Sequence, residues 1–177
     1  MALVKEQAAV KVNIRAIAKF LALAGVATVV PFYIHFQWIT GPLVNAILII
    51  ALFLLGIRSA LILCFVPSLM ALAGGLLPAV LAPVVPFIML GNTILVLIME
   101  WFYTNIKDAN KGYWLGLVIG ASLKFLFLFL NVNIVSRLLI KKELAAAVAG
   151  MMSWPQLATA LTGGLIAWGV LKKIKRI

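Results

Sequence analysis

The stretch 113-YWLGLVIGASLKFLFLFLNVNIV-135 decides the fold of this chain. It is long enough to cross a bilayer as one α-helix, which requires about 20 predominantly apolar residues. Its only charged side chain is Lys124, near its middle, and its other strongly polar members are Asn131 and Asn133. A lysine within hydrocarbon costs about 2.5–3.5 kcal/mol on insertion scales, so it normally faces a partner, a cavity or a ligand.

Lys124 has few possible ion-pair partners, because the only acids of the chain are Glu6, Glu100, Asp108 and Glu143. Glu100 is expected about five residues or more from Lys124 in depth, so we do not expect the two to pair directly. This shortage of acids favours a pocket around the lysine. The alternative is that its flexible stem lets the ammonium reach the membrane surface or backbone carbonyls.

The composition excludes an ordinary soluble domain. Hydrophobic residues make up 66% of the 177 residues and charged residues 11%, with a mean hydropathy of +1.21. A chain of this length holds about six spanning helices of roughly 20 residues each, so we expect one membrane domain over 1–177 and no catalytic domain outside it. The net charge of +11 is not read as a nucleic-acid signature, because the basic residues flank the apolar segments.

Breaks in the apolar pattern predict six membrane-spanning helices, which makes the fold an all-α polytopic membrane protein. The expected spans are 14–30, 41–56, 59–73, 84–103, 113–136 and 155 to the basic run 172–176. Gly41-Pro42 starts the second, with proline expected at its first position. Segment 74–86 contains two glycines and three prolines and remains open between a loop, a re-entrant piece and a kinked helix entry. Segment 137–153 is a candidate surface helix.

Lysine and arginine counts predict the orientation. With six spans, one side of the membrane carries eleven of these residues and the other three, Arg137, Lys141 and Lys142. Because basic residues accumulate on the cytoplasmic side, both termini are predicted to be cytoplasmic. The eleven are Lys5, Lys11, Arg15, Lys19, Arg58, Lys107, Lys111, Lys172, Lys173, Lys175 and Arg176.

Polar and aromatic residues from separate segments are predicted to share one depth, in a pocket open to the exterior. A site of amides, one cation and aromatic walls suits a small water-soluble ligand with an anionic or carbonyl-rich part. Lys124 and Asn131, seven apart, are expected on one helix face. The candidate binding residues are Lys124, Asn131, Asn92, Asn45, Gln156, Trp154, Gln37, Trp38 and His35.

Most of these residues can also be interpreted as purely structural, without a role in ligand binding. Asparagines in membrane helices often make hydrogen bonds that only hold the helices together, and tryptophans at span ends often anchor a helix at the membrane surface. Small-residue pairs such as Ala18-x-x-x-Ala22, Gly116-x-x-x-Gly120 and Gly163-Gly164 commonly serve internal helix contacts.

Other classes of function are less well supported by the residues. A single histidine and four scattered acids do not predict a metal site or an enzyme, and no P-loop for ATP is present. A stand-alone channel or transporter would usually carry several intramembrane acids. That class and a purely structural assembly subunit remain alternatives, and no cofactor is expected.

Two stretches, 154-WPQLATALTGGLIA-167 and 86-PFIMLGN-92, together with the predicted six-span topology and the Ala18/Ala22 pattern, resemble the substrate-binding S components of energy-coupling factor (ECF) vitamin transporters. The resemblance implies a binder of a vitamin or related micronutrient in a prokaryotic cytoplasmic membrane. It also implies a membrane scaffold subunit and ATPase subunits as partners, with Ala18 and Ala22 at the scaffold interface and the loop carrying His35, Gln37 and Trp38 as a lid.

Overall fold

The structure, a computed structural model, describes residues 13–34, 36–75, 79–138 and 142–177. Over these residues the chain is α-helical and contains no strand. Seven α-helices and one short 3₁₀ helix follow one another: α1 (Ile14–Tyr33), α2 (Gln37–Leu55), α3 (Ile57–Ala73), η1 (Ala79–Val84), α4 (Val85–Asn105), α5 (Ala109–Leu138), α6 (Lys142–Met151) and α7 (Trp154–Lys173).

Five helical stretches are long and apolar enough to cross a membrane: Ile14–Tyr33, Gln37–Leu55, Leu81–Asn105, Ala109–Leu138 and Lys142–Lys173. The remaining core helix, α3, is apolar and has 17 residues, which corresponds to about 26 Å at 1.5 Å per residue. The prediction of an all-helical chain is therefore confirmed, and its apolar helices are compatible with a multi-pass membrane protein.

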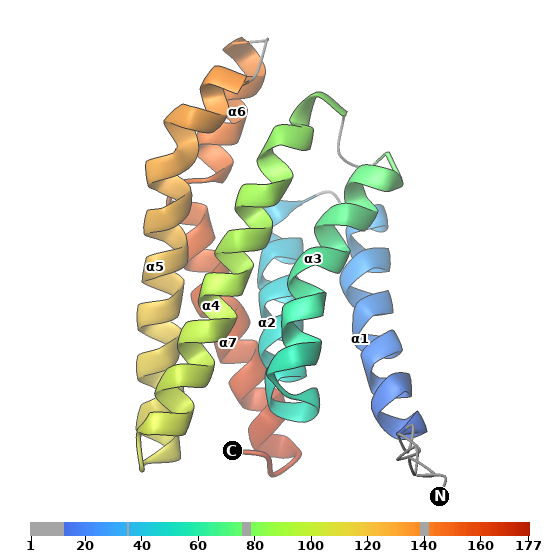
Figure 1. The fold of residues 1–177 in the computed structure, drawn as a ribbon, viewed down its shortest axis with the longest axis vertical. Helices are drawn as coiled ribbons and strands as arrows, with labels where there is room; N and C mark the ends of the chain where they lie inside the picture. Colours follow the sequence, from blue (N-terminus) through green and yellow to red (C-terminus); the bar gives the residue numbers. More distant parts are fainter. Residues whose placement is uncertain (1–12, 35, 76–78, 139–141) are drawn as a thin grey trace, which may run out of the picture.

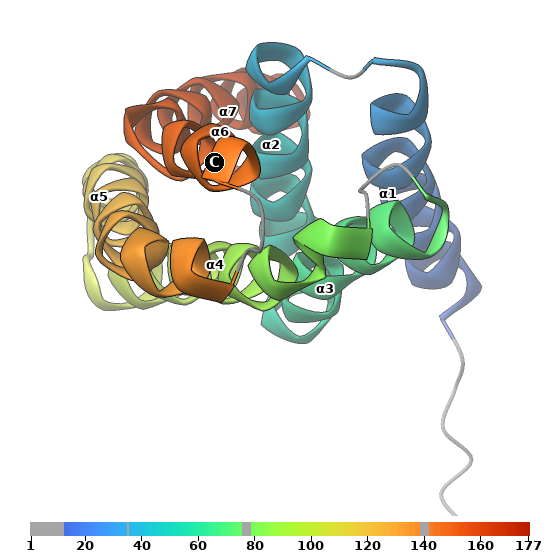
Figure 2. The same ribbon diagram turned by 90° about the horizontal axis from the view of Figure 1, so that it is seen from above.

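The helices α1 to α5 run alternately up and down, and α6 and α7 both run back down, so that the start of α1 and the end of α7 lie at the same end of the bundle (Figure 1). The α6 helix and η1 lie at the opposite end. Seen from above, α1 stands at the edge and contacts α2 and α3, while α4 packs along α5 and α2 along α7 (Figure 2). The main hydrophobic core lies among these last four helices and α3.

Glycines set the close approach of α4 and α5. A β-carbon on Gly116 would stand 3.1 Å from the Met99 Cα, and one on Gly120 would stand 3.2 Å from the Leu95 carbonyl oxygen. Since both neighbours are backbone atoms, a larger residue at either position would push the helices apart. The Gly116-x-x-x-Gly120 pair thus serves an internal helix contact.

Two predicted helix boundaries were wrong by several residues. Pro31 does not end α1, which continues to Tyr33 and closes with Ile34 N–H donating to the Val30 carbonyl at 3.0 Å. A proline in the last turn removes only one intrahelical hydrogen bond, which neighbouring turns tolerate. The α2 helix begins at Gln37, before Gly41, because the Phe36 carbonyl accepts the backbone N–H groups of Ile39 and Thr40 at 3.0 Å each.

The structure also answers two questions that the sequence left open. In the segment 74–86, η1 forms a 3₁₀ turn that leads directly into α4, with a proline in the first turn of that helix; residues 76–78 lie outside the described residues. The linker 137–153 contains the helix α6. The fifth helix starts earlier than predicted, because the Asp108 carboxylate accepts the N–H groups of Asn110 and Lys111 at 3.0 and 3.1 Å and caps it.

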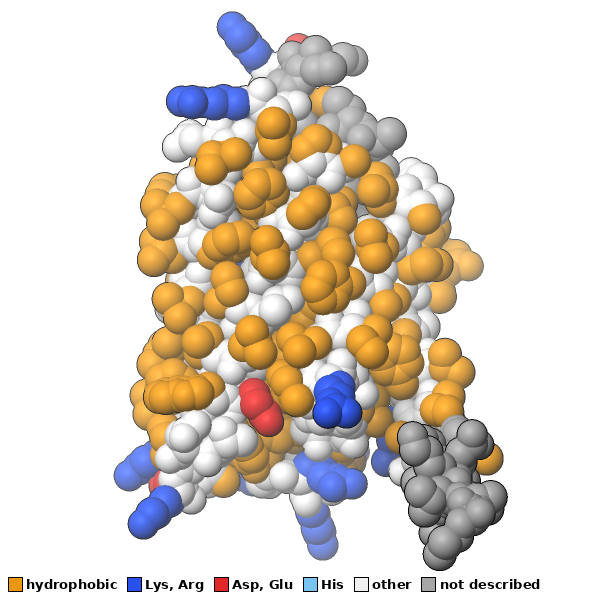
Figure 3. Space-filling view, viewed as in Figure 1, with side chains coloured by type: hydrophobic (Ala, Val, Ile, Leu, Met, Phe, Trp, Pro, Cys, Tyr) orange, Lys and Arg blue, Asp and Glu red, His pale blue; other side chains and the backbone are white. Residues whose placement is uncertain are grey.

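Charged side chains gather at the two ends of the bundle, and the flank between them is largely apolar (Figure 3). Of the described lysines and arginines, nine belong to the end with the termini, two to the other end, and Lys124 lies between them. Basic residues at the ends of apolar helices are expected where the helices would leave the hydrocarbon of a bilayer.

Candidate ligand-binding site

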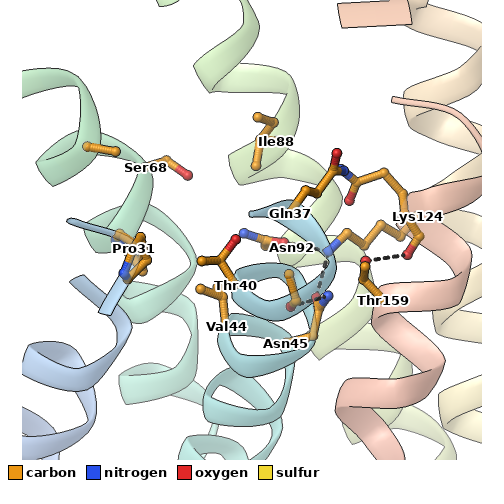
Figure 4. A pocket seen from close by; sticks show the side chains of 14 residues that line it. Pro31, Gln37, Thr40, Val44, Asn45, Ser68, Ile88, Asn92, Lys124 and Thr159 are labelled. Atoms are coloured by element: carbon orange, nitrogen blue, oxygen red, sulfur yellow. Dashed lines mark hydrogen bonds between the residues drawn. The ribbon is translucent and has the colours of Figure 1, made fainter. Parts of the chain in front are cut away.

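Lys124 lies near the midpoint of α5 and is almost completely enclosed, with 2% of its surface exposed. Its Nζ donates to Asn45 Oδ1 on α2 and to Asn92 Oδ1 on α4, each at 2.7 Å (Figure 4). Hydrogen bonds with an ionised donor are short and stronger than neutral ones. One side chain thus ties three helices together.

No carboxylate of a described residue takes part in this arrangement. Over the described residues, the only ion pair joins Lys111 and Asp108 at 4.0 Å, at the end of the bundle that carries the termini. An ammonium has three N–H donors, and two of those on Lys124 are used by the asparagines. The third has no acceptor within the described part of the chain. Within the described residues, the cation is therefore held by neutral dipoles alone.

The two asparagines differ in how they are fixed. Asn45 is 2% exposed, and its Nδ2 donates to the Gly41 carbonyl at 2.9 Å, which turns its oxygen towards the lysine. Asn92 is 4% exposed, and its Nδ2 donates to no other described residue. Among described side chains, Trp168 Nε1 is the one fully buried polar atom without a hydrogen-bond partner. The Asn92 Nδ2, which also lacks a partner, is therefore not fully buried and faces open space.

That space is a cavity of about 190 Å³ in the half of the bundle away from the termini. It offers room for roughly six waters at about 30 Å³ each. Its polar lining combines one cation with amides and hydroxyls: Gln37, Thr40, Asn45, Ser68, Asn92, Lys124, Gln156 and Thr159. Apolar walls come from Pro31, Val44, Pro67, Ala71 and Ile88, and no described lining residue is acidic.

Close contact between α2 and α7 positions one wall of this cavity. A β-carbon on Gly41 would stand 2.9 Å from the Thr159 methyl carbon, and one on Gly163 would stand 2.6 Å from the Pro42 carbonyl oxygen. The two helices can approach each other closely because Gly41 and Gly163 have no side chain at the contact. This approach brings Asn45 of α2 and Thr159 of α7 to the same cavity.

A cluster of polar and aromatic contacts joins the starts of α2 and α7 beside the cavity. Gln37 and Gln156 each donate from Nε2 to the carbonyl of Met151, at 3.1 Å, so that the end of α6 is held to both helices. Trp38 and Trp154 face one another with ring centroids 5.0 Å apart. We refer to these five residues as the outer clasp.

The structure brings five of the predicted binding residues to one cavity, namely Lys124, Asn45, Asn92, Gln37 and Gln156; that they bind a ligand stays a prediction. Trp38 and Trp154 do not line it, because they pair with each other and remain 40% and 62% exposed. Asn131 does not line it either. Its Nδ2 donates to the Phe127 carbonyl at 2.7 Å, and seven residues carry it about 10 Å along the axis from Lys124. His35 lies outside the described residues.

Three polar lining residues were missed from the sequence: Thr40, Ser68 and Thr159. Thr159 follows Gln156 by three residues and so shares its helix face, a signal that was present in the sequence. Ser68 follows the buried Pro67 on α3, and only the tertiary fold brings that helix to the cavity.

The two alanines predicted at a partner interface, Ala18 and Ala22, lie on α1 and are exposed. Neither lines the cavity. In α1 only Ala27 is fully buried, while Phe20, Leu23 and Ala24 pack against the main core. The positions of Ala18 and Ala22 are left uncovered by the described bundle.

The described residues contain no group of three or more histidine, cysteine, aspartate or glutamate side chains that would hold a metal ion. Comparisons with models of protein families, with curated proteins and with solved structures find no match for this chain.

Proposed function

We propose that this protein is the substrate-binding membrane subunit of an ECF-type importer, which captures a small water-soluble vitamin or related micronutrient. The observation that carries the proposal is the cavity in which Lys124, Asn45 and Asn92 meet from three helices, with no acid among its described lining residues. Ligand sites are typically concave and mostly apolar, with a few convergent polar groups. A lysine within a membrane helix is costly, and it is usually retained where it serves function.

In this proposal six helices span a prokaryotic cytoplasmic membrane, with the 17-residue α3 as the short sixth span. The start of α1 and the end of α7 lie at one end of the bundle (Figure 1), and that end also carries nine of the described basic residues. The positive-inside rule assigns it to the cytoplasm. The cavity, in the opposite half, then opens towards the exterior, with the outer clasp beside its mouth.

The exposed face of α1 is the proposed docking surface for a membrane scaffold subunit. Small residues such as Ala18 and Ala22 let another helix approach closely, and α1 stands at the edge of the bundle (Figure 2). Because the chain has no P-loop, ATPase subunits bound to that scaffold would supply the energy for uptake.

Co-expression with candidate scaffold and ATPase subunits tests the proposal, followed by purification on a tag of this chain and native mass spectrometry. We expect a complex of this chain with the scaffold and ATPase subunits, and a retained small molecule. Ala18→Trp should abolish co-purification and uptake while ligand binding persists. Leu97→Trp, on the exposed side of α4, is the matched control and should leave both intact.

Other outcomes distinguish the remaining candidates. Ion or solute flux by the chain alone in liposomes would identify a stand-alone channel or transporter. Association with partners but no bound molecule, under all conditions of purification, would identify a structural assembly subunit. Loss of both ligand binding and co-purification in Ala18→Trp would show that this alanine serves internal helix contacts.

A further inference from the structure

We infer that the ligand carries an anionic group, a carboxylate or a phosphate, which binds the Lys124 ammonium at the floor of the cavity. This inference deepens the proposed function and rests on it. It starts from the contacts of Lys124, which is 2% exposed and hydrogen-bonded to two amide oxygens at 2.7 Å.

The charge balance of the site argues for an anion. Two asparagine oxygens stabilise the cation with dipoles, but they carry no net charge, and no described lining residue is acidic. A buried charge without a counter-charge is strongly unfavourable. A carboxylate or phosphate in the cavity would supply the missing negative charge at hydrogen-bond distance, where attraction in a low-dielectric site is large.

The hydrogen-bond balance points in the same direction. The third N–H of Lys124 and the Nδ2 of Asn92 have no acceptor within the described residues. By contrast, Gln37 and Gln156 each already direct one side-chain N–H to the Met151 carbonyl. The free donors of Lys124 and Asn92 are thus adjacent, and an anion with several acceptor oxygens can accept from both. A neutral carbonyl would satisfy a donor and leave the charge uncompensated.

The size of the cavity limits the enclosed part of the ligand. A volume of about 190 Å³ corresponds to roughly six displaced waters, below the 300–1,000 Å³ typical of drug-sized ligands. Val44 and Ile88 provide apolar contact surface beside the polar floor. The enclosed part is therefore a compact anionic head on a short carbon frame, and any larger portion extends towards the outer clasp.

The test compares acids with their neutral amides. Purified protein in nanodiscs of phosphatidylcholine is titrated with acetate and acetamide, benzoate and benzamide, nicotinate and nicotinamide, and inorganic phosphate, with thermal unfolding as the readout. Any molecule retained through purification is extracted, and its charge at pH 7 is measured by electrophoresis. We expect an anionic retained ligand, and an affinity for at least one acid more than tenfold above that of its amide.

Two variants assign this preference to Lys124. Lys124→Met keeps the length of the side chain without its charge, and the acid-over-amide preference should disappear. Leu126→Met, on the exposed side of α5, is the matched control and should retain it. Asn92→Asp places a carboxylate where Asn92 Oδ1 now accepts from Nζ, so this internal counter-ion should weaken binding of the acid by at least tenfold. Asn105→Asp, at the exposed end of α4, should not.

Several results would overturn the inference. These are a neutral or cationic retained ligand, equal affinity for an acid and its amide, and an acid preference that survives in Lys124→Met. Lack of binding by every acid and phosphate, together with no retained anion, would overturn it as well. If phosphatidylglycerol in the nanodiscs abolishes the effect of the acids, the anion is a lipid headgroup and the inference of a captured water-soluble anion fails. A neutral retained ligand with an intact importer complex would leave the proposed function standing.

Discussion

Gly163 of α7 lies directly against Asn45 of α2: a β-carbon at the glycine would stand 2.7 Å from the Asn45 β-carbon. The asparagine in turn holds the Lys124 ammonium at 2.7 Å. The absence of a side chain on one helix therefore fixes the position of a polar group that faces a third helix. This relationship links the small-residue pattern of the last helix to the candidate site.

Gly163→Ala is expected to damage the site. The added methyl group meets the Pro42 carbonyl and the Asn45 side chain, so α2 must shift, at a cost of about 1–3 kcal/mol for overpacking. We predict a lower unfolding temperature and at least tenfold weaker retention of the bound molecule. Gly169→Ala is the matched control, because a β-carbon there meets nothing within 4 Å. Equal behaviour of the two variants would show that the α2–α7 contact adapts to the methyl group.

Asn92→Leu removes one of the two acceptors of a buried cation. Hydrogen bonds to charged groups contribute about 1.5–3 kcal/mol, so we predict a loss of that size in the free energy of unfolding, measured in mixed micelles. The penalty should shrink when Lys124→Met is also present, because no charge then remains to be stabilised. A double-mutant cycle measures this coupling. Additive effects of the two substitutions would contradict a direct energetic link between the residues.

Trp38 and Trp154 are expected to hold the mouth of the cavity closed. Aromatic pairs of this kind contribute about 0.5–1.5 kcal/mol beyond their buried area. We predict that Trp38→Ala and Trp154→Ala each speed release of the bound molecule, measured in chase experiments, and that the double variant is no faster than the faster single one. Trp101→Ala is the control, since Trp101 pairs only with its neighbour Phe102 at the opposite end of the bundle. Release rates equal to wild type would remove the pair from any gating role.

The orientation of the chain can be tested with cysteines in a Cys64→Ala background, because Cys64 is the single native cysteine. In intact cells, Ser153→Cys should react with a membrane-impermeant maleimide, and Asn105→Cys should react only after permeabilisation. Asn105 is the last residue of α4 and Ser153 lies between α6 and α7, so the two positions lie towards opposite ends of the bundle. The reverse pattern would place the termini outside. It would also make the cavity open to the cytoplasm, in conflict with the proposed import.

The sequence by itself determined the helical class of this protein and the place of Lys124 within an apolar run. Apolar runs of about 20 residues require helices in hydrocarbon, because every backbone group must be hydrogen-bonded internally. A single cation within such an apolar run indicates a partner, a cavity or a ligand, whatever the topology of the chain. The shared depth of Asn45, Asn92 and Gln156 also followed from the predicted spans, since alternation of direction fixes depth along each helix.

Only the tertiary structure decided which of these groups meet. Depth does not specify rotation about a helix axis or which helices are neighbours, and both depend on side-chain contacts between distant segments. Asn131 shares the helix of Lys124 but bonds to its own backbone two turns further on. Thr159 and Ser68 reach the cavity because glycines at 41 and 163 let α7 approach α2, and because α3 packs on α4. Close approach of two helices depends on the surfaces of both, so it cannot be predicted from the residue pattern of either helix alone.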